Sequence, residues 1–562
     1  MSLLEKRESS AKLDDTIPLY CYIEGHEKKE TFVEYRIRVQ RGPNPENQWM
    51  VLHRYNDFDV MNKVLETSGA TLPLPPKKMF GNMDNAFIAE RLTGLQQYLQ
   101  RVMEEPMFVR HECFKQFMDP KNYPLKMQDE AAEQVAMFYR SEPSWELVET
   151  LPDIGWRIRK HYFLTKYTAA TQKNDRQILA WVEYGPDMIL SKEKDLPAAM
   201  KLLTNIMHPY IYPVRIATVH EKGAAIVRDF RQSGTLKDFI CKARPKTSHL
   251  KKYCYPKMTV SMQLEDIRRC GRQILEALKI LQDKGFPYGQ LHTGNIIMDG
   301  NVVRLLDIEN SILGVPSIYR HYLLELKQIK DLHQQDVYSF GHVLYEMTFG
   351  KELRAGATDE IPANCPPLIE PILSSILTSE ALKQGNLPTI KELLQLPFFA
   401  EVQLGPEEKM SLKIPSKLKE ALKQVKEEIE KRLKEDRKVL SQFRRYSKAQ
   451  AKATSKEEKD KRRQQRKQMK KQESLAENST SDRTKTSIRK AQSVDSSRTS
   501  NFPSVPPPPP LVPSPPPAAS TNGPTGAPTK NKGRGALLSS ITSFRKNNLK
   551  TTKTNDRSAP KV

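Results

Sequence analysis

The chain has 562 residues, enough for two or more domains, and a formal net charge of +23 with 40 prolines. That balance excludes a single compact enzyme. Its six cysteines form no Cys-x-x-Cys pair, which argues against a disulfide framework or a zinc site and favours reduced thiols in the cytoplasm. No signal peptide or run of 18 apolar residues is found, so any membrane contact is expected to be peripheral.

The first 125 residues combine a strand, a proline-rich turn and a helix. Arg54-Tyr55-Asn56-Asp57-Phe58 follows an alternating apolar run, as expected where a strand ends. Leu72-Pro-Leu-Pro-Pro-Lys-Lys-Met-Phe-Gly81 then leads into helical spacing from Phe87 to Leu99. This order resembles the PX (phox-homology) domain, which implies a three-stranded sheet with helices over residues 14–125.

The resemblance implies a phosphoinositide pocket built from four residues. Arg54 would clamp the 3-phosphate, and Tyr55 would stack beneath the inositol ring. Lys77 would meet the 1-phosphate, and Arg91 would bond the ring hydroxyls. A guanidinium binds phosphate oxygens in a two-point fork, whereas a lysine acts as a movable point charge.

The loop after the prolines is expected to touch the bilayer. Met79 and Phe80 stand where PX domains dip apolar side chains into lipid. The alternative is that the arginines are ordinary surface charges and that Met79 and Phe80 make a small core contact.

Residues 130–400 contain the landmarks of a bilobal protein kinase, in order. Helical spacing over 274–282 precedes Tyr288–Ile297, which matches the catalytic loop, and Leu305–Glu309, which matches the Asp-Phe-Gly segment. Asp336–Met347 and Leu387–Phe399 resemble two later helices of the large lobe. The resemblance therefore implies a protein-kinase-like fold.

The residues that perform phosphoryl transfer are altered. Gln290 occupies the position of the catalytic aspartate, and an amide cannot accept a proton as a carboxylate does. Asn295 and Asp307 match the two magnesium ligands, and they could hold a metal-nucleotide or only their own loop. His292 replaces the catalytic-loop lysine, where a structural hydrogen bond is the expected role.

The small lobe of the kinase-like region also departs from the pattern. No glycine occurs between Gly155 and Gly185, and the bulky residues 161–163 fall in the expected glycine-loop hairpin. Leu179–Val182 is the expected third strand but has no lysine, and residues 198–200 replace the glutamate that would pair with it. We expect a catalytically inactive protein that needs no cofactor, with weak ATP and magnesium binding left open. A divergent active serine/threonine kinase is the alternative.

Beyond residue 400, the pattern predicts a charged helix over 404–473. Apolar residues recur from Leu418 to Leu433 at helical spacing, suited to a partner helix, the kinase-like lobe or a solvated face. Residues 459–471 are densely basic, as in contacts with anionic membranes, acidic proteins or nucleic acids. No aromatic residue is interleaved there, which argues against specific nucleic-acid binding. Two interpretations of this basic run are left open: a second, weak membrane contact and a solvated helix.

Residues 474–533 are rich in Ser, Pro and Gly and are expected to be disordered. The tract Pro506–Pro517 favours polyproline II, which binds the aromatic grooves of profilin, SH3 or EVH1 domains. A plain spacer is the alternative.

Residues 534–554 resemble the WH2 actin-binding motif. The resemblance implies a helix that docks in a cleft of actin, followed by an extended segment. The implied contact residues are Leu537, Leu538, Ile541, Phe544, Leu549 and Lys550. A tail helix without a partner is the alternative.

Together these modules predict a multidomain α+β protein similar to the PX-domain-containing kinase-like family. The resemblance implies a scaffold in membrane-protein trafficking, cytoplasmic and peripheral on endosomal and plasma membranes. Actin and the β subunits of the Na,K-ATPase are the partners that it suggests.

Overall fold

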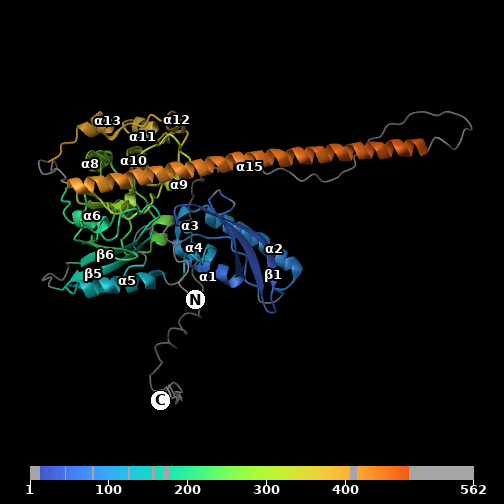
Figure 1. Cartoon of the computed structure of the whole chain (residues 1–562), viewed down its shortest axis with the longest axis horizontal. Coiled ribbons are helices and arrows are strands. Elements are labelled where there is room, and N and C mark those ends of the chain that lie inside the picture. Colours follow the sequence, from blue (N-terminus) through green and yellow to red (C-terminus); the bar gives the residue numbers. More distant parts are fainter. Residues whose placement is uncertain are drawn as a thin grey trace, which may run out of the picture. The chain divides into compact units, whose positions relative to one another are not determined.

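The computed structural model (Figure 1) describes residues 13–42, 44, 46–78, 81–124, 127–152, 154, 159–168, 176–405 and 414–479. Met79, Phe80, the polyproline tract and the WH2-like motif lie outside these residues. The part of the chain up to Lys471 forms one compact unit, and Gln472 begins a second. Within the described residues, no helix is long and apolar enough to cross a membrane.

The N-terminal module is a three-stranded antiparallel sheet with helices. Its strands, in the spatial order β1-β2-β3, are β1 (Leu19–Lys28), β2 (Val33–Arg41) and β3 (Gln48–Arg54). Its helices are α1 (Tyr55–Leu65), η2 (Glu66–Ser68), α2 (Asn85–Met103), α3 (Pro106–Arg110) and α4 (Glu112–Met118). Along β2, Val33, Tyr35, Ile37 and Val39 are buried and alternate with more exposed polar residues. This period of two gives the sheet one apolar face, which packs into the core of the module.

The small lobe of the second module is built on a five-stranded sheet in the order β4-β5-β6-β8-β7. These strands are β4 (Trp145–Thr150), β5 (Lys160–Tyr167), β6 (Arg176–Glu183), β7 (Ile216–Val219) and β8 (Gly223–Asp229). Helix α5 (Met127–Ser141) lies along one face of this sheet (Figure 1). Its Phe138 belongs to the core cluster that includes Trp181 and Val227. Helix α6 (Asp195–Leu203) belongs to the core cluster that includes Val182 and Ile226 from the other face.

The large lobe is mostly helical. Its elements are α7 (Leu236–Ile240), the π-helical turn η3 (Leu250–Cys254), α8 (Leu264–Asp283), η4 (Thr293–Asn295), β9 (Ile296–Asp299), β10 (Val302–Leu305), α9 (Arg320–Leu323), α10 (Leu332–Phe349), α11 (Glu370–Leu377), α12 (Ser379–Gln384), α13 (Ile390–Gln395) and α14 (Pro397–Ala400). Helix α10 is buried on nearly every side, so it forms the centre of this lobe. The loop that precedes η4 rests on α10, and this contact positions the kinase-like site.

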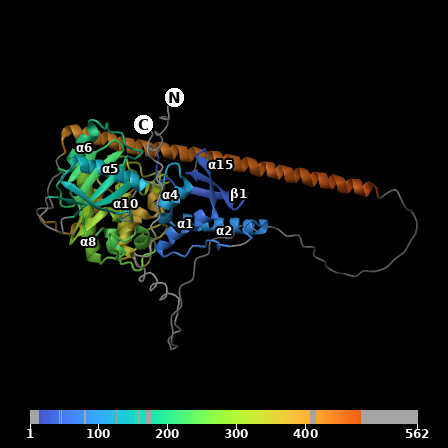
Figure 2. The ribbon, with the colours of Figure 1, turned by 90° about the horizontal axis from the view of Figure 1, so that it is seen from below.

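Helix α15 (Ser416–Ser479) is one unbroken helix in Figures 1 and 2. Its apolar face, with Leu422 and Val425 fully buried, joins the core of the kinase-like module. The predicted amphipathic pattern thus packs against the chain's own lobe, one of the three roles left open by the sequence. The helix begins at Ser416, later than the expected residue 404, and continues past residue 473.

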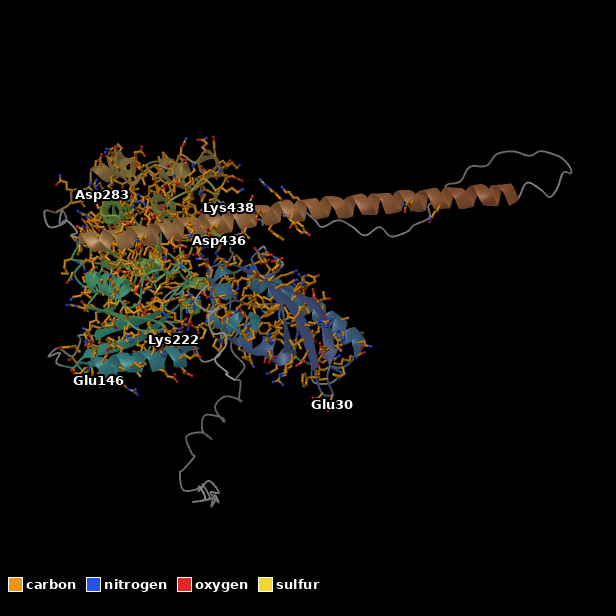
Figure 3. All side chains as sticks on the ribbon, viewed as in Figure 1. Glu30, Glu146, Lys222, Asp283, Asp436 and Lys438 are labelled. Atoms are coloured by element: carbon orange, nitrogen blue, oxygen red, sulfur yellow. The ribbon has the colours of Figure 1, made fainter. Side chains whose placement is uncertain are left out.

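Buried ion pairs hold the base of α15. Arg432 contacts both Asp14 and Asp187 at 2.5 Å, and Arg320 contacts Asp14 at 3.0 Å and Asp436 at 2.6 Å. Asp14, Asp187 and Arg320 are almost fully buried, so water screens these pairs weakly. Figure 3 labels Asp436 on this helix. The network therefore joins α15 to three other parts of the chain: the N-terminal segment, the small lobe and the segment before α10.

Candidate functional site

The loop Tyr288–Asn295 is held at both ends by structural hydrogen bonds. The amide of Gly289 donates to Asp336 Oδ1 at 2.9 Å, which ties the loop to α10. Burial raises the pKa of Asp336 to about 7, although the Gly289 bond lowers it. Asn295 donates from Nδ2 to the carbonyl of Gln290 at 3.0 Å, so its amide nitrogen closes the loop on itself.

Gln290 is buried in this loop and makes two bonds to the following segment. Its Nε2 donates to the carbonyl of Val315 at 2.9 Å, and its Oε1 accepts from Asn310 Nδ2 at 3.3 Å. These bonds connect the degenerate catalytic position to the segment that follows Asp307. In this arrangement Gln290 acts as a structural link and offers no base.

His292 is neutral. Its Nδ1 accepts a hydrogen bond from the Gly294 amide at 3.2 Å, which caps η4. Burial lowers its pKa to about 3, and the nearby positive charge of Lys237 adds to that shift. The geometry agrees with the structural hydrogen bond expected for this residue.

Two buried cations face the carboxylates that follow β10. Lys160 Nζ lies 2.8 Å from Asp307 Oδ1 and 3.3 Å from Glu309 Oε1. Arg228 donates two hydrogen bonds to the Glu309 carboxylate, from Nη1 to Oε1 at 3.1 Å and from Nη2 to Oε2 at 2.5 Å. All four residues are buried. We call this group of Lys160, Arg228, Asp307 and Glu309 the ionic lock.

The charges within the ionic lock favour each other's ionised forms. Burial alone would lower the pKa of Lys160, but Asp307 and Glu309 outweigh it, and the pKa is raised. Burial likewise opposes ionisation of Glu309, yet Arg228 and Lys160 lower its pKa. Two positive and two negative groups therefore balance without a metal ion. In the described part of the chain, no cluster of three or more His, Cys, Asp or Glu residues could hold one.

The lysine comes from a strand where the sequence did not predict it. Lys160 on β5 pairs directly with Val182 on β6, the position where the expected lysine is absent. The bulky residues 161–163, expected in the glycine-loop hairpin, lie in β5, which pairs with β4 on one edge and with β6 on the other. The signal in the sequence that could have indicated this lysine is its place at the start of an apolar strand.

The cleft beside the ionic lock is small. A cavity of about 100 Å³ remains there, lined by Ala180, Phe230, Asn295 and Asp307 among other residues. Ligand pockets usually measure roughly 300–1,000 Å³. The carboxylates that could bind a metal are already paired with Lys160 and Arg228, so the closed arrangement leaves little room for a nucleotide.

The PX-like module brings its candidate lipid-binding residues together. Arg91 is buried on α2, with its guanidinium 4.3 Å from the ring centre of Tyr55 and 4.2 Å from that of Phe87. It donates a hydrogen bond from Nη2 to the carbonyl of Pro76 at 3.3 Å. No acceptor for its Nε is found among the described residues. A positive group held in this way is suited to an anionic or hydroxyl-bearing ligand.

Of the other candidate residues of this pocket, Tyr55 contacts Arg91. Tyr55 also donates its hydroxyl to the carbonyl of Pro75 at 2.5 Å, which fastens the proline turn to α1. Arg54, which precedes Tyr55 in the chain, and Lys77, which follows Pro76, are exposed. The backbone amide of Arg54 donates to Asp57 at the start of α1, so the position of Arg54 is fixed while its side chain stays accessible.

Comparisons with known proteins bear on the whole chain. Residues 42–121 match the PX domain family, and residues 531–559 match the WH2 motif. A mouse (Mus musculus) protein described as "PX domain-containing protein kinase-like protein" is 49% identical over 422 residues, 75% of this chain and 72% of that protein. The chain belongs to the PX domain-containing kinase-like family. The predicted fold class, a multidomain α+β chain with a PX domain followed by a kinase-like fold, is thereby confirmed.

More distant relatives of this family share part of the chain. The "Slowpoke-binding protein" of Drosophila melanogaster is 31% identical over 280 residues, 46% of this chain and 53% of that protein. A "probable inactive serine/threonine-protein kinase slob2" of Dictyostelium discoideum is 29% identical over 308 residues, 53% of this chain and 52% of that protein. These descriptions support a kinase-like protein without catalysis, and the PX domain supports peripheral membrane association.

In this member of the family, the PX module also covers the loop face next to His292. Arg110 of α3 donates to the carbonyl of Ile318 at 3.3 Å, and Glu105 pairs with Arg354 at 2.8 Å. A cavity of only about 50 Å³ remains between the two modules, lined by Arg110 and Thr293 among others. This contact was not predicted from the sequence, because neither Arg110 nor Glu105 belongs to a motif of its own module.

Proposed function

We propose that this protein is a phosphoinositide-targeted pseudokinase adaptor, in which the kinase-like module serves as a platform and not as a phosphotransferase. The ionic lock is the observation that carries the proposal. Lys160 pairs with Asp307, the carboxylate that a kinase would offer to magnesium. Arg228 pairs with the neighbouring Glu309, and Gln290 supplies no base. Phosphoryl transfer depends on charge stabilisation and positioning, and both are missing here.

The PX module would bring the platform to membranes that carry 3-phosphoinositides. The buried Arg91 and the accessible Arg54 and Lys77 supply a fixed cation and two movable ones around Tyr55. Met79 and Phe80 would enter the bilayer beside this pocket. Endosomal and plasma membranes are the proposed locations, in the trafficking of membrane proteins.

The C-terminal tail would connect the platform to actin. The match to the WH2 motif supports this role, with Leu537, Leu538, Ile541 and Phe544 as the helical contacts and Leu549 and Lys550 as the extended ones. The polyproline tract would recruit profilin, SH3 or EVH1 domains. Loss of actin-monomer binding after truncation at residue 530 is the expected result, and unchanged binding would contradict this role.

The client of the kinase-like surface is proposed to be a membrane transport protein. A relative's description names Slowpoke binding, and the family resemblance suggests the β subunits of the Na,K-ATPase. Co-precipitation of the full chain with each candidate tests this proposal. A divergent active serine/threonine kinase remains the rival.

Flotation with lipid vesicles tests the targeting claim. Arg54→Ala should weaken binding to vesicles containing phosphatidylinositol 3-phosphate by tenfold or more, because a charge-assisted contact is lost. Arg101→Ala is the control: this arginine is exposed on α2 and pairs with Glu104 at 2.5 Å. Equal binding by wild type and Arg54→Ala would refute the assigned pocket.

A further inference from the structure

Helix α15 has two halves of different composition. The first half, to Arg444, is fixed to the kinase-like module, and Arg444 pairs with Glu325 at 2.6 Å. From Arg445 to Lys471 the helix carries 12 Lys and Arg residues but only 3 Asp and Glu residues. Arg445 and Lys448, at the start of this second half, are exposed.

The basic positions of the second half fall on one face of the helix. At 3.6 residues per turn, nine of them lie within an arc of about 100°. These positions are Arg445, Lys448, Lys452, Lys456, Lys459, Arg463, Arg466, Lys467 and Lys470. We call this set the basic stripe. The three acidic residues between 445 and 471, at positions 457, 458 and 460, lie outside that arc.

The basic stripe is straight and evenly spaced. Because the backbone is one continuous α-helix, its positions recur on average about every 5 Å over a length of about 38 Å. Such an array matches a flat surface of negative charge. A globular partner with a discrete acidic patch would match only a few of the positions at a time.

The composition of the helix excludes deep insertion. Among residues 447–471 the only apolar side chains are three alanines and Met469, so no apolar face accompanies the basic stripe. There is also no aromatic residue in this segment to stack on nucleic-acid bases. What remains is an electrostatic contact at the surface, where each Lys or Arg contributes about 1 kcal/mol near an anionic leaflet.

We propose that the basic stripe is a membrane-docking surface that lies along an anionic lipid bilayer. The ion pairs of Arg432 and Asp436 hold the base of the helix on the kinase-like module, so the stripe starts from a fixed point. The contact adds to the PX pocket and does not require it. Together the two would give the dual attachment that stable peripheral binding needs.

Two variants with the same charge change test the proposal. Lys452, Lys456 and Arg463 lie on the basic stripe, whereas Lys461, Arg462 and Lys471 lie off it. Each set is changed to Gln, a good helix former, in the full-length protein. Each variant therefore loses two lysines and one arginine, and circular dichroism checks that helix content is kept.

Binding is measured on vesicles of phosphatidylserine and phosphatidylcholine that contain no phosphoinositide, at about 0.1 M salt. At roughly fivefold per charge, the stripe variant should bind about a hundredfold more weakly, and the off-stripe variant less than tenfold. Equal loss in both variants, or no loss in either, would overturn the proposal. The proposal would also be overturned if, in parallel sedimentation, the stripe variant lost binding only to actin filaments or to single-stranded RNA.

The same vesicles separate this proposal from the PX assignment. Arg54→Ala should leave binding to phosphatidylserine vesicles unchanged, and the stripe variant should keep its preference for phosphatidylinositol 3-phosphate. If the PX assignment is wrong, only the preference for phosphatidylinositol 3-phosphate will be missing. If the basic-stripe proposal is wrong, the two Gln variants will bind phosphatidylserine vesicles equally.

Discussion

The ionic lock makes a quantitative prediction for Glu309→Gln. The substitution removes one carboxylate and leaves Arg228, which is buried, without its charged partner. Breaking a buried ion pair from one side costs about 3–5 kcal/mol, because the remaining charge is poorly solvated. For a domain of this size the melting temperature should fall by roughly 5–15 °C.

The matched control is Glu146→Gln. Glu146 pairs with Lys166 at 3.0 Å on the surface, where Figure 3 labels it, and both side chains are about half exposed. Its loss should leave the melting temperature unchanged, since exposed pairs contribute little.

A double-mutant cycle separates lost pairing from lost packing. Arg228→Leu with Glu309→Leu removes both charges, and well-packed apolar replacements of a buried pair are often neutral. The double variant should therefore be more stable than Glu309→Gln by several kcal/mol in denaturant unfolding. Additive losses from the two single changes, or a silent Glu309→Gln, would refute the assigned pairing.

Two further predictions concern the buried charges elsewhere in the unit. Because the pKa of Asp336 is raised from its ordinary 3.8 to about 7, the folded state holds a proton that the unfolded state releases between these pH values. Its contribution to the free energy of unfolding should thus fall as pH rises from about 4 to 7, by on the order of 4 kcal/mol. In denaturant titrations at several pH values, Asp336→Asn should flatten this dependence of the unfolding free energy on pH. An unchanged pH dependence in the variant would contradict the raised pKa. Arg432→Ala should remove one of the two arginines that pair with the buried Asp14 and Asp187, and it should speed hydrogen exchange in the first half of α15. Lys438→Ala, at an exposed residue labelled in Figure 3, should not. Equal protection in the two variants would show that the ion pairs do not hold the helix.

Local sequence patterns predicted the modules well. Alternation along β2 and helical spacing before Tyr288 follow directly from which residues must face a core. The prolines before Lys77 likewise mark a turn. These signals need no knowledge of which segments meet in space.

The ionic lock could not be predicted in this way. Lys160 and Asp307 are 147 positions apart in the chain, and Arg228 meets Glu309 from a third segment. Strand register decides that Lys160 stands opposite Val182, and register follows from tertiary pairing rather than from composition. For the same reason nothing marked Asp14 as a partner of Arg320 and Arg432.

The central claim is that the chain's own cations occupy the place of a metal-nucleotide. Thermal unfolding of the full-length protein with and without millimolar Mg·ATP tests it most directly. A ligand at a hundred times its Kd stabilises a protein by about 2.7 kcal/mol, a shift that is easily measured. We expect no magnesium-dependent shift. A clear rise in melting temperature that disappears in Asp307→Ala would contradict the claim and restore the cleft as a nucleotide site.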